Sequence, residues 1–231
     1  MALKNIKYFD NQIESALMLQ DVLPITTIKK EGWVLVGLSN NSLVMIEKLN
    51  KLLNCNYDRL FIEPVYAPNN NECEIAMISE TDEIVMHERL IESFEIKKDY
   101  VYGEAHRKHE DDILREIYKM RKGESFINVK DQHVLLIDLG NETGLSILTS
   151  IKSLFKLGAS NISIALPVIA KDIYDELLSI VDDIYTLHIL DNYISAYFYY
   201  KDVIDLSNEE VEKILEKRNH GDATKVRVQQ K

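Results

Sequence analysis

One stretch, residues 133–146, constrains the fold of this chain more than any other. A strand-like segment at 133–138, with a short apolar run of β-type residues at its centre, is followed by a turn at 140–144. Beyond the turn, apolar residues recur every three or four positions, and Gly158 stands where a helix C-terminal cap belongs. This pattern predicts a strand, a loop and a helix. Such a junction directs unpaired backbone N–H groups and the positive end of a helix dipole at one spot, which suits a phosphate or another anion.

Strands and helices alternate along the rest of the chain. Apolar runs predict strands at 33–39, 58–66, 75–78, 161–168 and 183–190, with an edge strand at 194–200. Helical spacing predicts helices at 9–22, 42–53, 103–121 and 170–180, with another after the capping box at 207–210. This alternation predicts a doubly wound α/β fold whose central sheet is mainly parallel, with helices on both faces. Strands 33–39 and 133–138 are expected to be neighbours, with Asp138 close to Ser39 at the ligand-binding edge.

The junction at 133–146 also resembles a known family. Asp138, Thr143, Gly144 and Ser146 fit the signature of type I phosphoribosyltransferases, which is a hydrophobic strand, two acidic residues, a short loop, Thr-Gly and a small hydroxyl residue. The resemblance implies that Asp138 holds the ribose hydroxyls of phosphoribosyl pyrophosphate, with Mg²⁺ as cofactor. It also implies that the loop cradles the 5-phosphate through Asn141, Thr143, Gly144, Leu145 and Ser146. Without the flanking motif, Asp138 would be read as an ordinary turn cap.

The sequence departs from the family pattern at one residue and at one loop. Leu139 occupies the second acidic position, and the loop that corresponds to the family's pyrophosphate loop, Ser39, Asn40 and Asn41, contains neither a basic residue nor a glycine. The resemblance would place these three residues against the ligand. The sequence therefore favours a phosphoribosyltransferase-like protein that binds a nucleotide or phosphosugar, with catalysis weak or lost. The alternative is an active Mg²⁺-dependent phosphoribosyltransferase that joins a nucleobase to phosphoribosyl pyrophosphate.

Glu142 is the candidate catalytic residue. In purine-type members of the family, an acidic residue directly before Thr-Gly acts as a general base toward the purine, and Glu142 has that position. A loop carboxylate of this kind is more often only solvated. His106 and His109 are separated by helical spacing, but the strongly charged segment around them favours a solvated surface, so no protein metal site is expected.

Composition limits the size, the location and the partners that can be expected of this protein. The chain has 231 residues, 46% of them hydrophobic, which suits a single domain over residues 1–216 with a charged cover or insertion at 81–123 and a flexible basic tail at 217–231. The net charge of −11 disfavours nucleic acid and anionic membranes as partners. No long apolar run or signal-type N-terminus is present, so a cytoplasmic protein is expected. Cys55 and Cys73 are expected to be reduced thiols, and the protein is expected to form a homo-oligomer.

Overall fold

The protein contains two β-sheets. The computed structural model describes residues 8–141 and 143–218. The larger sheet consists of β1 (Val34–Gly37), β2 (Tyr57–Arg59), β6 (His133–Ile137), β7 (Gly140–Asn141), β8 (Asn161–Ala170) and β9 (Asp183–Leu190). The smaller sheet consists of β3 (Ile62–Ala67), β4 (Asn70–Ser79) and β5 (Ile84–Met86).

Helices account for most of the remaining described residues. They are α1 (Gln12–Leu19), α2 (Ile25–Glu31), α3 (Asn40–Leu53), α4 (Glu88–Ser93), α5 (Lys98–Lys108), η1 (His109–Ile113), α6 (Leu114–Arg121), α7 (Leu145–Lys156), α8 (Lys171–Leu177), η2 (Ala196–Tyr199) and α9 (Asn208–Glu216). None of the helices in the described ranges is long and apolar enough to cross a membrane.

The larger sheet has the predicted parallel architecture. Its strand order is β2-β1-β6-β8, with β7 and β9 also paired to β8, and every described strand pair of this larger sheet is parallel. Strands β1 and β6 are neighbours, in register from Val34 opposite Val134 to Gly37 opposite Ile137. The expected doubly wound α/β fold is thus confirmed, and the carboxyl ends of β1 and β6 lie side by side, where ligands bind in open parallel sheets.

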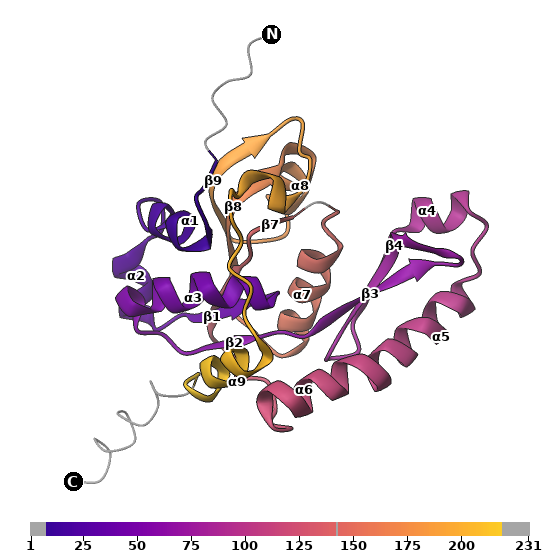
Figure 1. Ribbon diagram of the computed structural model, residues 1–231, viewed down its shortest axis with the longest axis horizontal. Helices are drawn as coiled ribbons and strands as arrows, with labels where there is room; N and C mark the ends of the chain where they lie inside the picture. The colour runs from indigo at the N-terminus through magenta and orange to yellow at the C-terminus, as the bar shows by residue number, and fades with distance from the viewer. Residues whose placement is uncertain (1–7, 142, 219–231) are drawn as a thin grey trace.

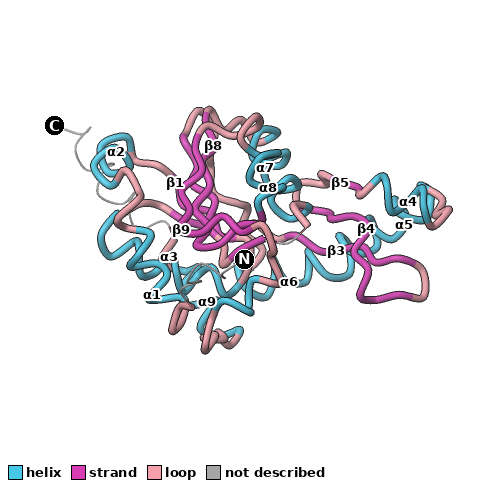
Figure 2. Tube along the Cα trace, turned by 90° about the horizontal axis from the view of Figure 1, so that it is seen from above, coloured by secondary structure: helices cyan, strands magenta, loops and turns pink. Residues whose placement is uncertain are grey.

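Helices cover both faces of this sheet, because side chains alternate between the two faces along each strand. In β1 and β6, Leu35, Leu135 and Ile137 join the core shared with α1 and α3, whereas Val34 and Val134 join the core shared with α7. Figure 2 shows α1, α3 and α9 on one side of the sheet and α7 on the other. This two-sided burial explains why β1 and β6 are continuously apolar in sequence.

The smaller sheet and helices α4 to α6 form an arm, defined here as residues 62–121, which extends to one side of the larger sheet (Figure 1). The charged segment expected as a cover, 81–123, supplies β5 and the helices of this arm. The helix predicted at 103–121 is present as the continuous run α5-η1-α6, with wider π-type turns at η1.

Two predicted strands are wrong. Residues 58–66 do not form one strand: β2 belongs to the parallel sheet, and after Leu60 and Phe61 the chain enters the arm as β3. Residues 194–200 do not form an edge strand either. The Ser195 side chain accepts a hydrogen bond from the Phe198 N–H and so begins the short helix η2, leaving only Tyr200 to form a bridge with Phe9.

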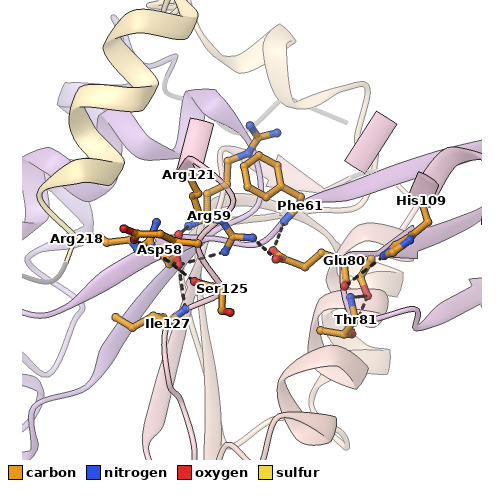
Figure 3. Close-up of polar contacts among 12 residues, drawn as sticks. Asp58, Arg59, Phe61, Glu80, Thr81, His109, Arg121, Ser125, Ile127 and Arg218 are labelled. Atoms are coloured by element: carbon orange, nitrogen blue, oxygen red, sulfur yellow. Dashed lines mark hydrogen bonds and ion pairs between the residues drawn. The ribbon is translucent and has the colours of Figure 1, made fainter. Parts of the chain in front are cut away.

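A buried group of ions joins the arm to the sheet (Figure 3). Arg121, at the end of α6, contacts Asp58 of β2 at 3.3 Å and also pairs with Glu80, which follows β4. Arg218 reaches Asp58 at 3.5 Å and Glu124 at 2.7 Å. The sequence places Arg218 in a solvated tail, but only 4% of this residue is exposed, because its guanidinium pairs with these carboxylates. The rest of the predicted tail, from residue 219 onward, lies outside the described residues.

Candidate functional site

The structure brings Asp138 and Ser39 together as predicted. Asp138 follows β6 directly, and Ser39 follows β1 and caps the N-terminus of α3. The Ser39 hydroxyl donates a hydrogen bond of 2.8 Å to Asp138 Oδ1. Burial raises the pKa of Asp138 to about 6, while the bonds from Ser39 and from the Leu139 N–H and the charge of Arg59 act in the opposite direction. Asp138 therefore changes charge close to neutral pH.

The turn after β6 closes tightly around its glycines. A Cβ on Gly140 would lie 2.7 Å from the Tyr193 hydroxyl and 2.8 Å from Val168 Cγ2, so no larger residue fits there. Gly144 has φ of +74° and begins α7 without a side-chain cap, while the Thr143 hydroxyl accepts a bond of 3.4 Å from the Leu145 N–H. The N-terminus of this 12-residue helix thus faces the loop, as the sequence predicts for an anion site.

A cavity of about 490 Å³ lies at this junction. Asp138, Gly140, Thr143 and Ser146 form one side of it. The remaining lining residues come from the arm and from the segment after β9, and they are Glu72, Cys73, Glu74, Met77, Leu90, Tyr193, Ser195, Ala196 and Tyr197. Three residues of the predicted signature therefore share one cavity with residues that are distant in sequence.

Sequence reasoning missed the opposite wall of the cavity. Glu72 and Glu74 lie on β4, before the segment expected to cover the site, and Tyr193 and Tyr197 follow β9. No local pattern marks these residues, because only the packing of the arm and of the segment 193–197 brings them to the junction. The described lining holds three carboxylates, with Asp138 the third, and no lysine, arginine or histidine.

The Leu139 side chain packs in the hydrophobic core and does not line the cavity. This side chain is only 3% exposed and belongs to the hydrophobic core beneath the sheet edge. The Leu139 carbonyl accepts a bond of 3.0 Å from the Tyr200 hydroxyl. The position that is acidic in the family is thus part of the core here and supplies no group to the cavity.

The Ser39 to Asn41 loop is shorter than predicted, because α3 begins at Asn40 rather than at Ser42. Ser39 and Ser42 cap one another, and the Asn41 amide donates a bond of 3.3 Å to the Tyr197 hydroxyl. Asn40 Oδ1 accepts a bond of 2.5 Å from Nη1 of Arg59, which ends β2. A cation therefore does lie at this edge of the sheet, supplied by the next strand. Arg59 lies inside the strand predicted at 58–66, so no sequence signal pointed to it.

The other residues predicted to bind the ligand do not line the candidate cavity among the described residues. Leu145 is buried in the first turn of α7, Asn141 pairs with Ile169 through β7, and Glu142 lies outside the described residues. Among residues 8–141 and 143–218, no three histidine, cysteine, aspartate or glutamate side chains form a group that could hold a metal ion.

A larger cavity, of about 710 Å³, opens at the opposite edge of the sheet, where the strands begin. Polar side chains line most of it, including Glu31, Asn56 and His133. The His133 ring stacks on Trp33, with centroids 3.5 Å apart, and bonds to the Ser163 hydroxyl, which holds it in the wall. The smaller cavity is the candidate functional site, because of these two it alone combines the carboxyl ends of the strands, a helix N-terminus and the residues of the signature.

Replacing Asp138 with asparagine is expected to stabilise the protein at pH 7. The folded-state pKa of about 6 lies above the ordinary value of 3.8, so the charged form opposes folding. The cost is absent below about pH 4, grows between pH 4 and 6, and is complete above pH 6, where it amounts to about 2 to 3 kcal/mol. Urea unfolding of Asp138→Asn should show this gain at pH 7 and almost none at pH 4. The exposed Asp191→Asn is the control, and an equal gain at both pH values would contradict the assignment.

The fold and the junction together define the class of protein: a mainly parallel α/β sheet with helices on both faces and a strand-loop-helix junction at its edge, the arrangement that the sequence resemblance to type I phosphoribosyltransferases implies. The protein TT1426 from Thermus thermophilus has this fold, with a TM-score of 0.72 and 23% identity over 90% of this chain and 97% of that one. No protein-family model and no curated protein sequence matches the chain.

Two enzymes match at lower TM-scores. A purine phosphoribosyltransferase from Pyrococcus horikoshii has a TM-score of 0.39 and 13% identity over 81% of this chain and 99% of its own. A hypoxanthine-guanine phosphoribosyltransferase from Bacillus anthracis has a TM-score of 0.44 and 11% identity over 88% of this chain and 96% of its own. At these levels of similarity, neither enzyme carries an argument about activity.

Proposed function

We propose that this chain is a phosphoribosyltransferase-like protein that binds a nucleotide or phosphosugar and in which phosphoribosyl transfer is weak or lost. The observation that carries the proposal is the cavity where Asp138, Thr143 and Ser146 meet the N-terminus of α7. In this arrangement the helix dipole and the hydroxyls favour a phosphate, and Asp138 accepts hydrogen bonds from sugar hydroxyls.

Leu139 and the charges of the cavity support the loss of transfer. With Leu139 in the core, only one of the family's two acidic groups is available to the ribose. The cavity wall supplies three carboxylates and no cation among the described residues, so the departing pyrophosphate is poorly neutralised there. Glu72 and Glu74 instead favour a ligand whose other end carries amino groups or similar hydrogen-bond donors.

The alternative is an active Mg²⁺-dependent transferase, and Arg59 is the observation that favours it. Its guanidinium bonds to Asn40 beside Ser39, so a cation stands near the edge where pyrophosphate would leave. In that enzyme Mg²⁺ would neutralise the leaving group, and the protein would contribute orientation through Asp138 and the amides of α7. Glu142 as a general base belongs only to this alternative.

Ligand binding without turnover is the expected result when ribose 5-phosphate, nucleoside monophosphates and phosphoribosyl pyrophosphate are added with and without Mg²⁺. A ligand at 100 times its Kd should add about 2.7 kcal/mol and raise Tm by several degrees. A pyrophosphate-release assay with common nucleobases should remain at background. Rapid, nucleobase-dependent release of pyrophosphate would instead establish the transferase.

A matched pair of variants tests whether the phosphate binds at the junction or elsewhere on the surface. Ser146→Glu places a negative charge in the first turn of α7, where it favours the helix but repels a bound phosphate. The Tm shift caused by sugar phosphates should disappear in this variant. Ser160→Glu, exposed at the opposite edge of the sheet, should keep it. Equal shifts in both variants would mean that the phosphate binds elsewhere.

A further inference from the structure

The strand β9 forms one edge of the larger sheet. Among the strands of the described ranges it pairs only with β8, so no described strand lies on its other side. Backbone N–H and C=O groups on such a side are available to a strand from another chain. The opposite edge differs, because β2 has only three residues and its Tyr57 N–H donates to the Arg218 carbonyl at 3.4 Å, which brings the C-terminal segment against it.

β9 lacks the features by which proteins usually protect a sheet edge. It is eight residues long, contains no proline, lysine or arginine, and keeps one register along β8 without a bulge. The edge strand of the smaller sheet, β3, has such features: it contains Pro64, and its register against β4 shifts on both sides of Tyr66. A long, unprotected edge strand that is rich in β-branched and aromatic residues pairs readily with another chain.

The two faces of β9 are already used by the fold. Tyr185 and Leu187 pack against the core shared with α1 and α3, and Ile184 packs against the core on the other side of the sheet. Large apolar side chains in β9 or close to it in sequence are 36% to 55% exposed, and they are Leu178, Ile180, Ile189 and Ile194. The edge and these side chains are therefore the surface that a partner would contact.

The net charge of −11 restricts how two copies of this chain can meet, because their carboxylates repel. In an antiparallel pair related by a two-fold axis, one residue of β9 lies opposite its own copy. With Thr186 at the axis, Asp183 of one copy lies opposite Ile189 of the other, and no two carboxylates along the strand face each other. With Leu187 at the axis, Asp183 would instead lie opposite Asp191. Charge therefore favours the pairing about Thr186.

We propose that β9 is the interface of a homodimer, in which two copies pair edge to edge and antiparallel about Thr186, so that their larger sheets form one continuous sheet. The backbone groups of β9 provide the hydrogen bonds. Lasting interfaces usually bury about 1,200 Å² or more, and the exposed apolar side chains beside the strand extend the contact toward that size. The two-fold pairing uses the same edge of both copies, so it closes at the dimer. Residues 193–197 follow β9 and line the candidate cavity, so pairing would also hold that wall in place.

Sedimentation equilibrium of the full chain over a dilution series tests this interface. The parent protein should have twice the monomer mass, and Thr186→Lys should weaken dimerisation at least tenfold, because the two lysines would lie opposite each other. Thr26→Lys, the same substitution at an exposed position of α2, should change the dissociation constant less than twofold. Ile189→Lys places a lysine opposite Asp183 of the other copy, so this variant should dimerise as tightly as the parent or more tightly.

Hydrogen–deuterium exchange of the parent protein needs no folded variant. Backbone amides of residues 183–190 should exchange more slowly in the dimer than after dilution to the monomer, whereas those of residues 62–67, in the edge strand β3, should not change. The inference is overturned if the chain is monomeric at near-millimolar concentration, if exchange at 183–190 does not depend on concentration, or if Thr186→Lys dimerises as tightly as the parent. Dissociation of the Ile189→Lys protein would contradict the pairing about Thr186.

Discussion

Replacing Arg121 with methionine should destabilise the protein by about 3 to 5 kcal/mol, which is a large part of the stability of a typical domain. Neither the Arg121 nor the Asp58 side chain is exposed, and Glu80 is 5% exposed. Methionine keeps the apolar contact with Phe61 but leaves both carboxylates buried without their main counter-ion. Burial already raises the pKa of Asp58 and Glu80, and removing Arg121 raises both further.

Urea unfolding measures this effect, and two further variants define its cause. Arg115→Met removes an exposed arginine that pairs with Asp112 in the same helical run and should cost less than about 1 kcal/mol. Adding Glu80→Gln to Arg121→Met should recover part of the loss, because one uncompensated charge is then gone. The loss should also shrink as the pH falls toward the ordinary carboxyl pKa values. A loss below about 1 kcal/mol for Arg121→Met would show that the cluster contributes little to folding.

The sequence was sufficient for elements whose signal is local. Residues 134–137 are continuously apolar because β6 is buried on both faces, and Gly144 permits the turn that begins α7. The pairing of β1 with β6 followed from the alternation of strands and helices, since strands of this kind lie in one parallel sheet. The contact between Ser39 and Asp138 then followed from the topology.

The failures occur where distant contacts decide the structure. Residues 194–200 alternate like a strand, yet Ser195 caps a helical turn and Tyr200 bonds back to Leu139. Arg218 resembles the tail that follows it, and only its carboxylate partners, Asp58 and Glu124, reveal that it is buried. These contacts connect segments that are far apart in sequence.

About half of the candidate site was predictable, because those residues belong to a local pattern in the sequence. Asp138, Thr143 and Ser146 belong to one local motif, so sequence spacing places them together. Glu72 and Tyr193 reach the cavity through the packing of the arm and of the segment after β9, which no periodicity encodes. Arg59 was not predictable, because the family pattern places the cation in the loop after β1, whereas the structure supplies it from β2.

Restoring the family's second acidic residue by Leu139→Asp should destabilise the protein by about 5 kcal/mol or more at pH 7, instead of improving ribose binding. The Leu139 side chain is 3% exposed in the core, so the substitution removes buried apolar contacts and leaves an unpaired carboxylate there. Burial of that kind raises a carboxyl pKa by up to about 3 to 5 units, and each unit corresponds to about 1.4 kcal/mol.

Leu139→Asn separates the effect of the charge from that of the lost packing, because asparagine has nearly the same shape without the charge. Above the ordinary carboxyl pKa, the aspartate variant should be less stable than the asparagine variant by several kcal/mol. Below about pH 4, the introduced carboxyl group is protonated in both the folded and unfolded states, so the two variants should become similar. If Leu139→Asp were instead as stable as the parent and bound ribose 5-phosphate more tightly, residue 139 would have to turn toward the cavity. In that case, the leucine at position 139 would affect only the chemistry of the site. The buried position of Leu139 predicts instead that its side chain is needed for the stability of the core.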